Sequence, residues 1–356
     1  MSETRTMPGS EIRATHGEAL VEVRDLKKHF PLQSGFLAGL LNRGEIPAVR
    51  AVDGVNFEIR RGEVFGLAGE SGSGKSTVGR LVLNLLEPTG GQVLFDGTDL
   101  SNLSHEEMRR LRSRMQIIFQ DPLASLNPRM TIAQTIAHPS EIHQPDLTPN
   151  QRHHQVLEIL DAVGMSPPDI FADKYPHQIS GGQRQRVVIA RALVTQPDLI
   201  VADEPIAMAD VSVRSLLLDL MMKLKDEFDL TYLFITHDLA TAKYVCDRIA
   251  IMYLGKLAEI GPLADVYGSP LHPYTEALLE AVPVPDPRHR RTQPMPAGEI
   301  PSAINPPPGC SFHPRCPLAV EGVCDVELPV LEPDPANGDR RHLAACHVRT
   351  GKLATS

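Results

Sequence analysis

The chain has 356 residues, 42% of them hydrophobic and 22% charged, which are ordinary proportions for a globular protein longer than one average domain. A net charge of −9 argues against a nucleic-acid partner, because proteins that bind nucleic acid usually present a basic face. No stretch approaches the roughly 20 apolar residues of a membrane-spanning helix, and the polar N-terminus lacks the apolar core of a secretory signal, so we expect a cytoplasmic protein.

The first part of the chain is expected to contain a flexible tail and two strands. Residues 1–18 are polar and predict the tail, whereas 19–30 and 51–59 show the alternation of strands. Residues 31–47, between these strands, are punctuated by glycine and proline and have an apolar centre. This insertion is either a surface loop packed on its own core or a loop that contacts a partner.

Buried strands alternate with helices through the middle of the chain. Residues 63–69, 197–205 and 231–238 are short apolar runs typical of buried strands, residues 75–86 predict a helix, and 121–182 are rich in helix signals. This alternation predicts an α/β fold with a mainly parallel sheet that is covered on both faces. A further buried helix is indicated by an apolar stripe at Val213, Leu216, Leu217, Leu220, Met221, Leu224 and Phe228.

The C-terminal part has a different composition. From about residue 283 the chain is rich in proline, which predicts a linker or an extended strap. Four cysteines follow at a spacing of C-x5-C-x7-C-x21-C, unlike the C-x2-C pairs of common zinc folds. In the cytoplasm, Cys310, Cys316, Cys324 and Cys346 indicate a [4Fe–4S] cluster, reduced or variably paired thiols in a small packed domain, or zinc. Cys246 lies in a helical pattern and is expected in the core.

The sequence GESGSGKST matches the phosphate-loop pattern G-x-x-x-x-G-K-S, with a strand before it and a helix after it. Its glycines allow backbone N–H groups to surround phosphates, its lysine reaches the β- and γ-phosphates, and its serine can bind Mg²⁺. We assign the phosphate contacts to Gly69, Ser71, Gly72, Gly74, Lys75, Ser76 and Thr77.

Polar side chains follow three of the predicted strands. Asp203 and Glu204 end one strand, and Gln120 and His237 each follow another. Because ligands bind at the carboxyl ends of parallel strands, these side chains are expected to converge on the γ-phosphate. We assign Mg²⁺ to Ser76, Gln120 and Asp203, the general base to Glu204, and supporting catalytic roles to Gln120 and His237.

A second phosphate-binding element lies more than a hundred residues after the phosphate loop. Ser180, Gly181, Gly182 and Gln183 open a predicted helix, whose first N–H groups and dipole favour an anion. One chain therefore carries two elements suited to phosphate.

The order of these motifs along the chain resembles that of the ATP-binding cassette (ABC) ATPases, over roughly residues 20 to 265. The order is the phosphate loop, Gln, Ser-Gly-Gly-Gln, Asp-Glu and His. The resemblance implies a RecA-like P-loop core, an antiparallel β subdomain, an inserted helical subdomain and a head-to-tail dimer. In such a dimer, Ser180 to Gln183 complete the ATP site of the neighbouring subunit, and Asp210 lies in a turn at the dimer contact. Phe30 is a candidate for stacking on adenine or, alternatively, a core aromatic. Gln120 would couple the nucleotide to a membrane partner.

The domain organisation follows from this resemblance. It comprises the tail 1–18, a nucleotide-binding domain 19–265 with its helical subdomain at about 121–182, and an extension 266–356 with the proline-rich linker and the cysteines.

Several stretches resemble the ATPases of oligopeptide and dipeptide importers more narrowly, in particular "IIFQDPLASLNPRMT", "PLHPYTEALLEAVP" and the cysteine segment. "LLEPTGGQVLFDG" resembles the second, F-type, ATPase subunit. The resemblance implies a heterodimer with another ATPase subunit, two permease subunits, a solute-binding protein, and a position on the cytoplasmic face of the membrane. Some members of this group carry sugar oligomers. The resemblance also implies a [4Fe–4S] cluster in the ATPases of some relatives, chiefly in those of the partner subunit type.

The sequence departs from the family pattern at two places. Ile179 replaces the usual leucine, which conserves volume. Residues 207–210 read Ala-Met-Ala-Asp where Ser-Ala-Leu-Asp is usual, which alters the turn expected at the dimer contact. The alternatives from other classes are a soluble ABC ATPase that acts on nucleic acid or ribosomes, and a non-hydrolysing regulatory cassette.

Overall fold

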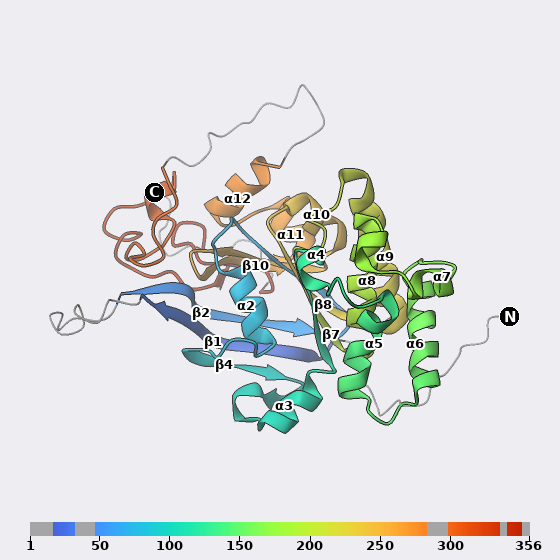
Figure 1. Cartoon of the computed structure of the whole chain (residues 1–356). Coiled ribbons are helices and arrows are strands. Elements are labelled where there is room, and N and C mark those ends of the chain that lie inside the picture. Colours follow the sequence, from blue (N-terminus) through green and yellow to red (C-terminus); the bar gives the residue numbers. More distant parts are fainter. Residues whose placement is uncertain (1–16, 33–46, 283–297, 335–339, 351–356) are drawn as a thin grey trace.

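The computed structural model describes residues 17–32, 47–282, 298–334 and 340–350. The centre of the predicted insertion, most of the predicted tail and the first part of the proline-rich linker lie outside the described residues. Two sheets form the frame, with helices α5 to α8 together on one side and the smaller sheet and the C-terminal segment on the other (Figure 1). This arrangement confirms the predicted α/β fold with an antiparallel β subdomain.

The smaller sheet is antiparallel and has the order β2-β1-β4-β5. Both strands predicted near the N-terminus are present in it, although the second begins three residues earlier than expected. Their bounds are β1 (Ala19–Pro31), β2 (Ala48–Arg60), β4 (Gly90–Phe95) and β5 (Thr98–Asp99), followed by η1 (Leu100–Asn102) and α3 (His105–Leu111).

The larger sheet has the order β11-β12-β10-β9-β3-β8-β7-β6. Strands β6, β7, β8, β3 and β9 are parallel, as the alternation of strands and helices predicted, and the remaining pairs are antiparallel. Two short strands of the C-terminal segment extend this sheet, which the sequence did not predict. The bounds are β3 (Val64–Ala68), β6 (Met115–Ile118), β7 (Leu199–Asp203), β8 (Thr231–Thr236), β9 (Arg248–Tyr253), β10 (Lys256–Pro262), β11 (Glu332–Pro333) and β12 (Leu343–Ala344).

Helix α2 (Lys75–Val82) packs between the two sheets and joins them through one apolar core. It ends four residues before the predicted end of this helix. The helical subdomain contains α4 (Pro122–Ser125), α5 (Ile132–His143), α6 (Pro149–Ala162), α7 (Pro168–Ala172), η2 (Pro176–Gln178) and the start of α8 (Gly181–Leu193). The later helices are α9 (Val211–Phe228), α10 (Leu239–Val245), α11 (Leu263–Gly268), α12 (Pro273–Glu280) and η3 (His313–Arg315).

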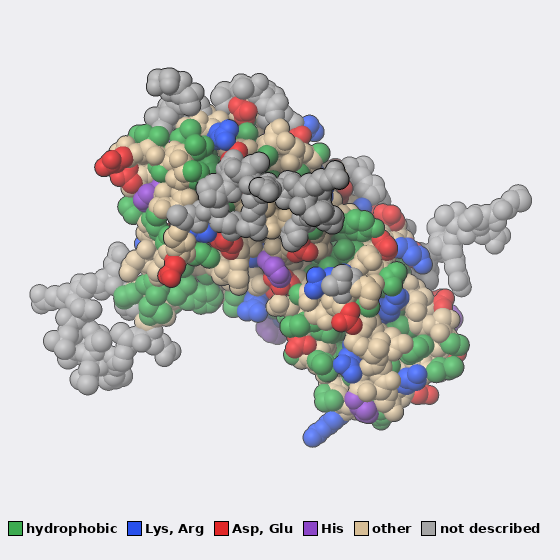
Figure 2. Space-filling model, turned by 90° about the horizontal axis from the view of Figure 1, so that it is seen from above, with side chains coloured by type: hydrophobic (Ala, Val, Ile, Leu, Met, Phe, Trp, Pro, Cys, Tyr) green, Lys and Arg blue, Asp and Glu red, His purple; other side chains and the backbone are tan. Residues whose placement is uncertain are grey.

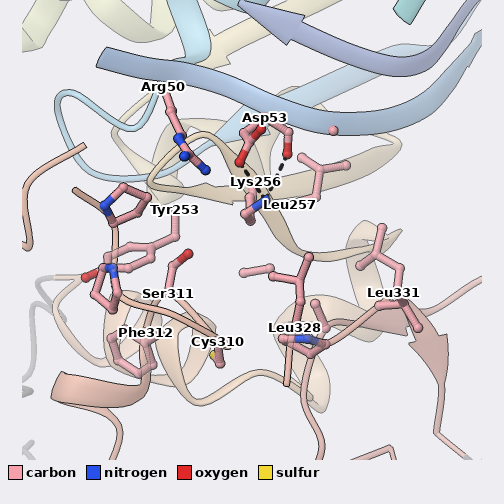
Figure 3. Close-up of a pocket in the computed structure, with 18 of the residues that line it drawn as sticks. Arg50, Asp53, Tyr253, Lys256, Leu257, Cys310, Ser311, Phe312, Leu328 and Leu331 are labelled. Carbon is pink, nitrogen blue, oxygen red and sulfur yellow. Dashed lines mark hydrogen bonds and ion pairs between the residues drawn. The ribbon is translucent and has the colours of Figure 1, made fainter. Parts of the chain in front are cut away.

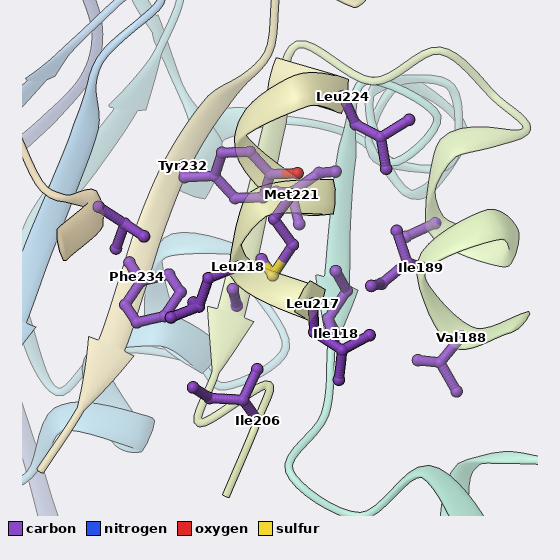
Figure 4. Packing of buried hydrophobic residues seen from close by; sticks show 14 of the residues in the cluster. Ile118, Val188, Ile189, Ile206, Leu217, Leu218, Met221, Leu224, Tyr232 and Phe234 are labelled. Carbon is purple, nitrogen blue, oxygen red and sulfur yellow. The ribbon is translucent and has the colours of Figure 1, made fainter. Parts of the chain in front are cut away.

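Helix α9 packs its apolar stripe against β6, β8 and α8 (Figure 4). Leu217, Met221 and Leu224 are fully buried there, as predicted. The prediction for Leu216 was wrong, because its side chain is 56% exposed. At 100° per residue, Leu216 lies roughly a quarter-turn from the centre of the stripe, so its side chain leaves the contact.

No helix in the described ranges has both the length and the apolar character to cross a membrane. On the face shown in Figure 2, acidic and basic side chains lie in small separate groups between hydrophobic ones.

Glu259 of β10 attaches the C-terminal segment to the larger sheet. Its fully buried carboxylate lies 2.6 Å from Nε2 of His342 and accepts hydrogen bonds from the N–H groups of Leu271 and His272 at 2.9 and 2.8 Å. Removing one partner of a buried pair leaves the other groups without compensation.

We therefore expect Glu259→Ala to lower the free energy of unfolding by about 3–5 kcal/mol, measured by urea denaturation. The control Glu276→Ala removes a partly exposed pair with Arg349 in the same region and should cost at most about 1 kcal/mol. Equal losses in the two variants would contradict the attachment role of Glu259.

Candidate nucleotide-binding site

The phosphate loop joins β3 to α2, and two of its glycines are required by close backbone contacts. A Cβ at Gly69 would lie 2.2 Å from the carbonyl oxygen of Met252, and one at Gly74 would lie 2.0 Å from that of Ala51. Gly72 has open space but a φ of +80°, which side chains rarely adopt. Gly74 caps α2 without a side-chain hydrogen bond, so the first N–H groups of this helix are available to an anion.

Lys75 is only 5% exposed, and its ammonium turns back onto the loop. Nζ donates to the carbonyl oxygens of Gly69 and Glu70, both at 2.8 Å, and to Oγ of Ser73 at 3.3 Å. Burial lowers the pKa of Lys75, and the nearby carboxylates of Glu204, Asp203 and Glu70 oppose this shift. A desolvated cation therefore lies where phosphate oxygens would enter the loop.

Ser76 at the start of α2 meets Asp203 at the end of β7. The hydroxyl of Ser76 donates to Oδ1 of Asp203 at 2.9 Å. Burial raises the pKa of this carboxyl, and the hydrogen bond from Ser76 opposes the rise. Hydroxyl and carboxylate oxygens are ligands that Mg²⁺ prefers, so this pair fits the ion, and the loop fits the phosphates of ATP.

Glu204 lies where three neighbouring strands end. Its carboxylate accepts a hydrogen bond from Nε2 of Gln120 at 2.8 Å and lies 2.7 Å from Nδ1 of His237. A φ of +49° at Glu204 turns the chain sharply after Asp203. The two adjacent carboxylates therefore contact different residues, Asp203 contacting Ser76 and Glu204 contacting Gln120 and His237. The structure thus brings Gln120, Glu204 and His237 together as expected, although Gln120 contacts Glu204 and not the Ser76–Asp203 pair.

Ser180 to Gln183 form the start of α8 and lie apart from α2 and the phosphate loop (Figure 1). Ser180 and Gln183 make a capping box, in which Oγ of Ser180 accepts from the N–H of Gln183 at 3.3 Å and Oε1 of Gln183 accepts from the N–H of Ser180 at 2.9 Å. Gly181 has open space where a Cβ would lie. This helix start therefore faces outward from the chain.

Phe30 and Asp210 lie at the surface. Phe30 is 36% exposed as a residue, so the alternative that it is a core aromatic was wrong. Asp210 is the N-cap residue of α9 but makes no side-chain capping hydrogen bond, and it lies in the same turn as the exposed Met208.

The four C-terminal cysteines line one small cavity as free thiols. Burial raises the pKa of Cys310 to about 11 and that of Cys316 to about 12, so both are neutral thiols when no metal is bound. Among the described residues, no three His, Cys, Asp or Glu side chains are arranged to hold a metal ion. As placed, the cysteines do not fit a cluster or zinc. Cys246 is buried against Gly66, as predicted.

Two features near the phosphate loop were not predicted from the sequence. A cavity of about 690 Å³ lies between β2, the turn after β9 and the C-terminal segment, and Arg50, Tyr253 and Phe312 lie around it (Figure 3). In addition, Glu70 of the loop contacts Tyr274 and Arg315. Nothing in the local sequence pattern connects these residues, because they are more than 200 positions from the loop.

Residues 52–207 match the family model "ABC transporter", and residues 258–324 match "Oligopeptide/dipeptide transporter, C-terminal region". The oligopeptide transport ATP-binding protein AppF of Bacillus subtilis is 46% identical over 338 residues, which cover 94% of this chain and 99% of the relative. The chain belongs to the ABC ATPase family. A putative peptide import ATP-binding protein of Brucella ovis is 48% identical over 312 residues, covering 88% of this chain and 93% of the relative.

Solved cassettes share the fold. The cassette MJ0796, in a dimeric post-hydrolysis state bound to ADP and Pi, has a TM-score of 0.59 and 28% identity, covering 68% of this chain and 98% of that structure. The cassette cbiO1 from Clostridium perfringens has a TM-score of 0.60 and 27% identity, covering 70% of this chain and 91% of that structure. Members of the ABC family bind ATP with Mg²⁺ and hydrolyse it, and the phosphate loop and Ser76–Asp203 pair of this cassette fit both.

Proposed function

We propose that this cassette is an ATP-hydrolysing subunit of a peptide importer. Of the two ATPase subunits of such importers, it is the second, or F-type, subunit. The observation that carries the proposal is the match of residues 258–324 to the C-terminal region of oligopeptide and dipeptide transporters, within 46% identity to AppF along almost the whole chain. A cassette that acted on nucleic acid or ribosomes would have no need of this region.

The phosphate loop, the Ser76–Asp203 pair, Glu204 and His237 each have a proposed role. The loop from Gly69 to Thr77 binds the phosphates through its N–H groups and Lys75, and Ser76 with Asp203 holds Mg²⁺, which neutralises phosphate charge. Glu204 takes a proton from the water that attacks the γ-phosphorus. Because a carboxylate can only accept, Nδ1 of His237 carries the proton in their contact and fixes the orientation of Glu204.

We propose that each ATP is also contacted by Ser180 to Gln183 of the neighbouring subunit. Ser180 to Gln183 face outward at the start of α8, and the similar cassette MJ0796 is dimeric in its structure with ADP and Pi. We propose a head-to-tail pair in which these residues bind the γ-phosphate held by the partner's loop, with Asp210 at the contact. The partner is a second, different ATPase subunit, and Phe30 stacks on adenine.

We place this pair on the cytoplasmic face of the membrane, with two permease subunits and a solute-binding protein. Purification of the tagged chain from detergent-solubilised membranes tests this directly. The permeases and a second ATPase subunit should co-purify, and short peptides presented with the solute-binding protein should stimulate ATP hydrolysis. A complex confined to the soluble fraction and containing nucleic acid would overturn the proposal.

A [4Fe–4S] cluster is the finer hypothesis for the cysteine segment. Its support is that four cysteines, the number such a cluster uses, surround one cavity, although their thiols do not form a metal site as placed. Assays for iron, acid-labile sulfide and zinc on anaerobically purified protein separate the cluster, zinc and free thiols.

A further inference from the structure

The C-terminal region makes two hydrogen bonds to Glu70, a residue of the phosphate loop. Glu70 follows the first glycine of the loop, and its carboxylate accepts a hydrogen bond from Arg315 at 3.1 Å. The backbone N–H of Glu70 donates to the hydroxyl of Tyr274 at 2.9 Å. Arg315 lies in η3 and Tyr274 in α12, so two separate elements of the C-terminal region meet at this residue.

The same residue touches the lysine of the loop. Nζ of Lys75 donates to the carbonyl oxygen of Glu70 at 2.8 Å. The N–H, the side chain and the carbonyl group of Glu70 are therefore each bound, two by the C-terminal region and one by Lys75. Any shift of Glu70 would move a carbonyl group that positions the lysine.

Arg315 is itself fixed in a buried aromatic setting. Its side chain is 7% exposed, and its guanidinium lies 5.8 Å from the ring centre of Phe312 and 5.9 Å from that of Tyr253. The two rings meet edge to face at 5.4 Å on the wall of the cavity in Figure 3. The guanidinium also donates to the hydroxyl of Tyr253 at 3.4 Å. Its direction toward Glu70 is therefore set by packing.

Stability alone does not account for this ion pair. The side chain of Arg315 is 7% exposed and that of Glu70 is 26% exposed, so the guanidinium loses most of its hydration while a partly exposed pair gains little from its mutual attraction. Nε of Arg315 is also buried without a hydrogen-bond partner among the described residues, which adds a desolvation cost. What the pair provides is a fixed position for Glu70.

We propose that Arg315 and Tyr274 are positioning residues for the phosphate loop, through which the C-terminal region sets the affinity of this cassette for ATP. The proposal deepens the proposed function and rests on the role of the loop in binding ATP. A loop already held in its binding shape loses less conformational freedom when ATP binds. Without the hydrogen bonds from Arg315 and Tyr274, part of the binding free energy of ATP is spent on ordering the loop, and the affinity is lower.

Arg315→Met tests the proposal in the full-length chain, because methionine replaces the charge with apolar volume. We expect the Kd and KM for MgATP to rise about tenfold, near the lower end of what one charge-assisted hydrogen bond contributes, with kcat changed less than about twofold. Arg315→Lys keeps the charge and should recover part of the loss. Glu70→Gln should weaken binding in the same direction, and the double variant should lose little more than Arg315→Met.

Arg349→Met is the matched control, since it removes a different ion pair of the same region, to Glu276, and should leave ATP affinity unchanged. Wild-type affinity in both Arg315→Met and Glu70→Gln would overturn the inference, as would equal weakening in Arg349→Met. Glu70→Gln leaves the C-terminal region intact, so its affinity for MgATP tests the inference if Arg315→Met does not fold. Failure of the proposed function is distinguishable, because then wild-type protein would not bind ATP or Lys75→Ala would bind it equally well.

Discussion

Glu204→Gln should reduce ATP hydrolysis by about 10²–10⁴-fold while leaving ATP binding intact, because the variant keeps the shape of the site and loses the proton acceptor. The amide oxygen of the variant can face Nδ1 of His237, and its NH2 group can face the amide oxygen of Gln120 once the side-chain amide of Gln120 turns over, so both contacts of residue 204 are kept. Phosphate release in single-turnover experiments measures the loss. With hydrolysis blocked, ATP should also hold the two cassettes together, which analytical ultracentrifugation detects.

The control for this prediction is Glu227→Gln, on the exposed side of α9, which should hydrolyse ATP at the wild-type rate. Turnover of Glu204→Gln within about threefold of wild type would remove Glu204 from its proposed role.

Ser180→Arg should lower hydrolysis in the assembled ATPase pair by about a hundredfold, the effect of removing one well-placed donor from a charged transition state. The reason is that Ser180 and the N–H groups behind it are proposed to contact the γ-phosphate of the partner's ATP. Binding of ATP to the loop of this chain should not change, because that loop lies on another part of the fold. A photoreactive ATP analogue that labels each subunit separately measures this retained binding.

Ser104→Arg controls for the lost helix cap. Ser104 makes the same capping box as Ser180, accepting from the N–H of Glu107 at 3.3 Å, at the start of α3 in the β subdomain. Either substitution should cost about 1 kcal/mol of stability. If Ser104→Arg and Ser180→Arg reduced hydrolysis equally, the effect would be one of helix stability, and the proposed contact between subunits would fail.

The sequence predicts those parts of the site that lie in one contiguous motif or directly after a predicted strand. The phosphate loop is contiguous, and Gln120, Glu204 and His237 each follow an apolar run whose direction in a parallel sheet is known in advance. Their convergence was therefore predictable, and the structure shows it as hydrogen bonds of 2.8 and 2.7 Å to Glu204. Their catalytic roles stay predictions.

The unpredicted parts depend on contacts between distant segments. Arg315 is 245 residues from Glu70, and no periodicity relates the two. The strands β11 and β12 have two residues each, too short for an alternating pattern, and they form because the edge of β10 offers unpaired backbone groups. The error at Leu216 has a different cause, because its position a quarter-turn from the centre of the stripe follows from the helical period and already places it at the edge of the contact.

Uptake of a radiolabelled oligopeptide by the cells from which this chain comes, with Glu204→Gln replacing the native residue at its own locus, tests the central claim most directly. If ATP hydrolysis by this cassette drives peptide import, uptake should fall to the background of a strain lacking the gene, while the transporter complex is still assembled in the membrane. Uptake at the wild-type rate, with the purified variant shown to be inactive in ATP hydrolysis, would contradict it.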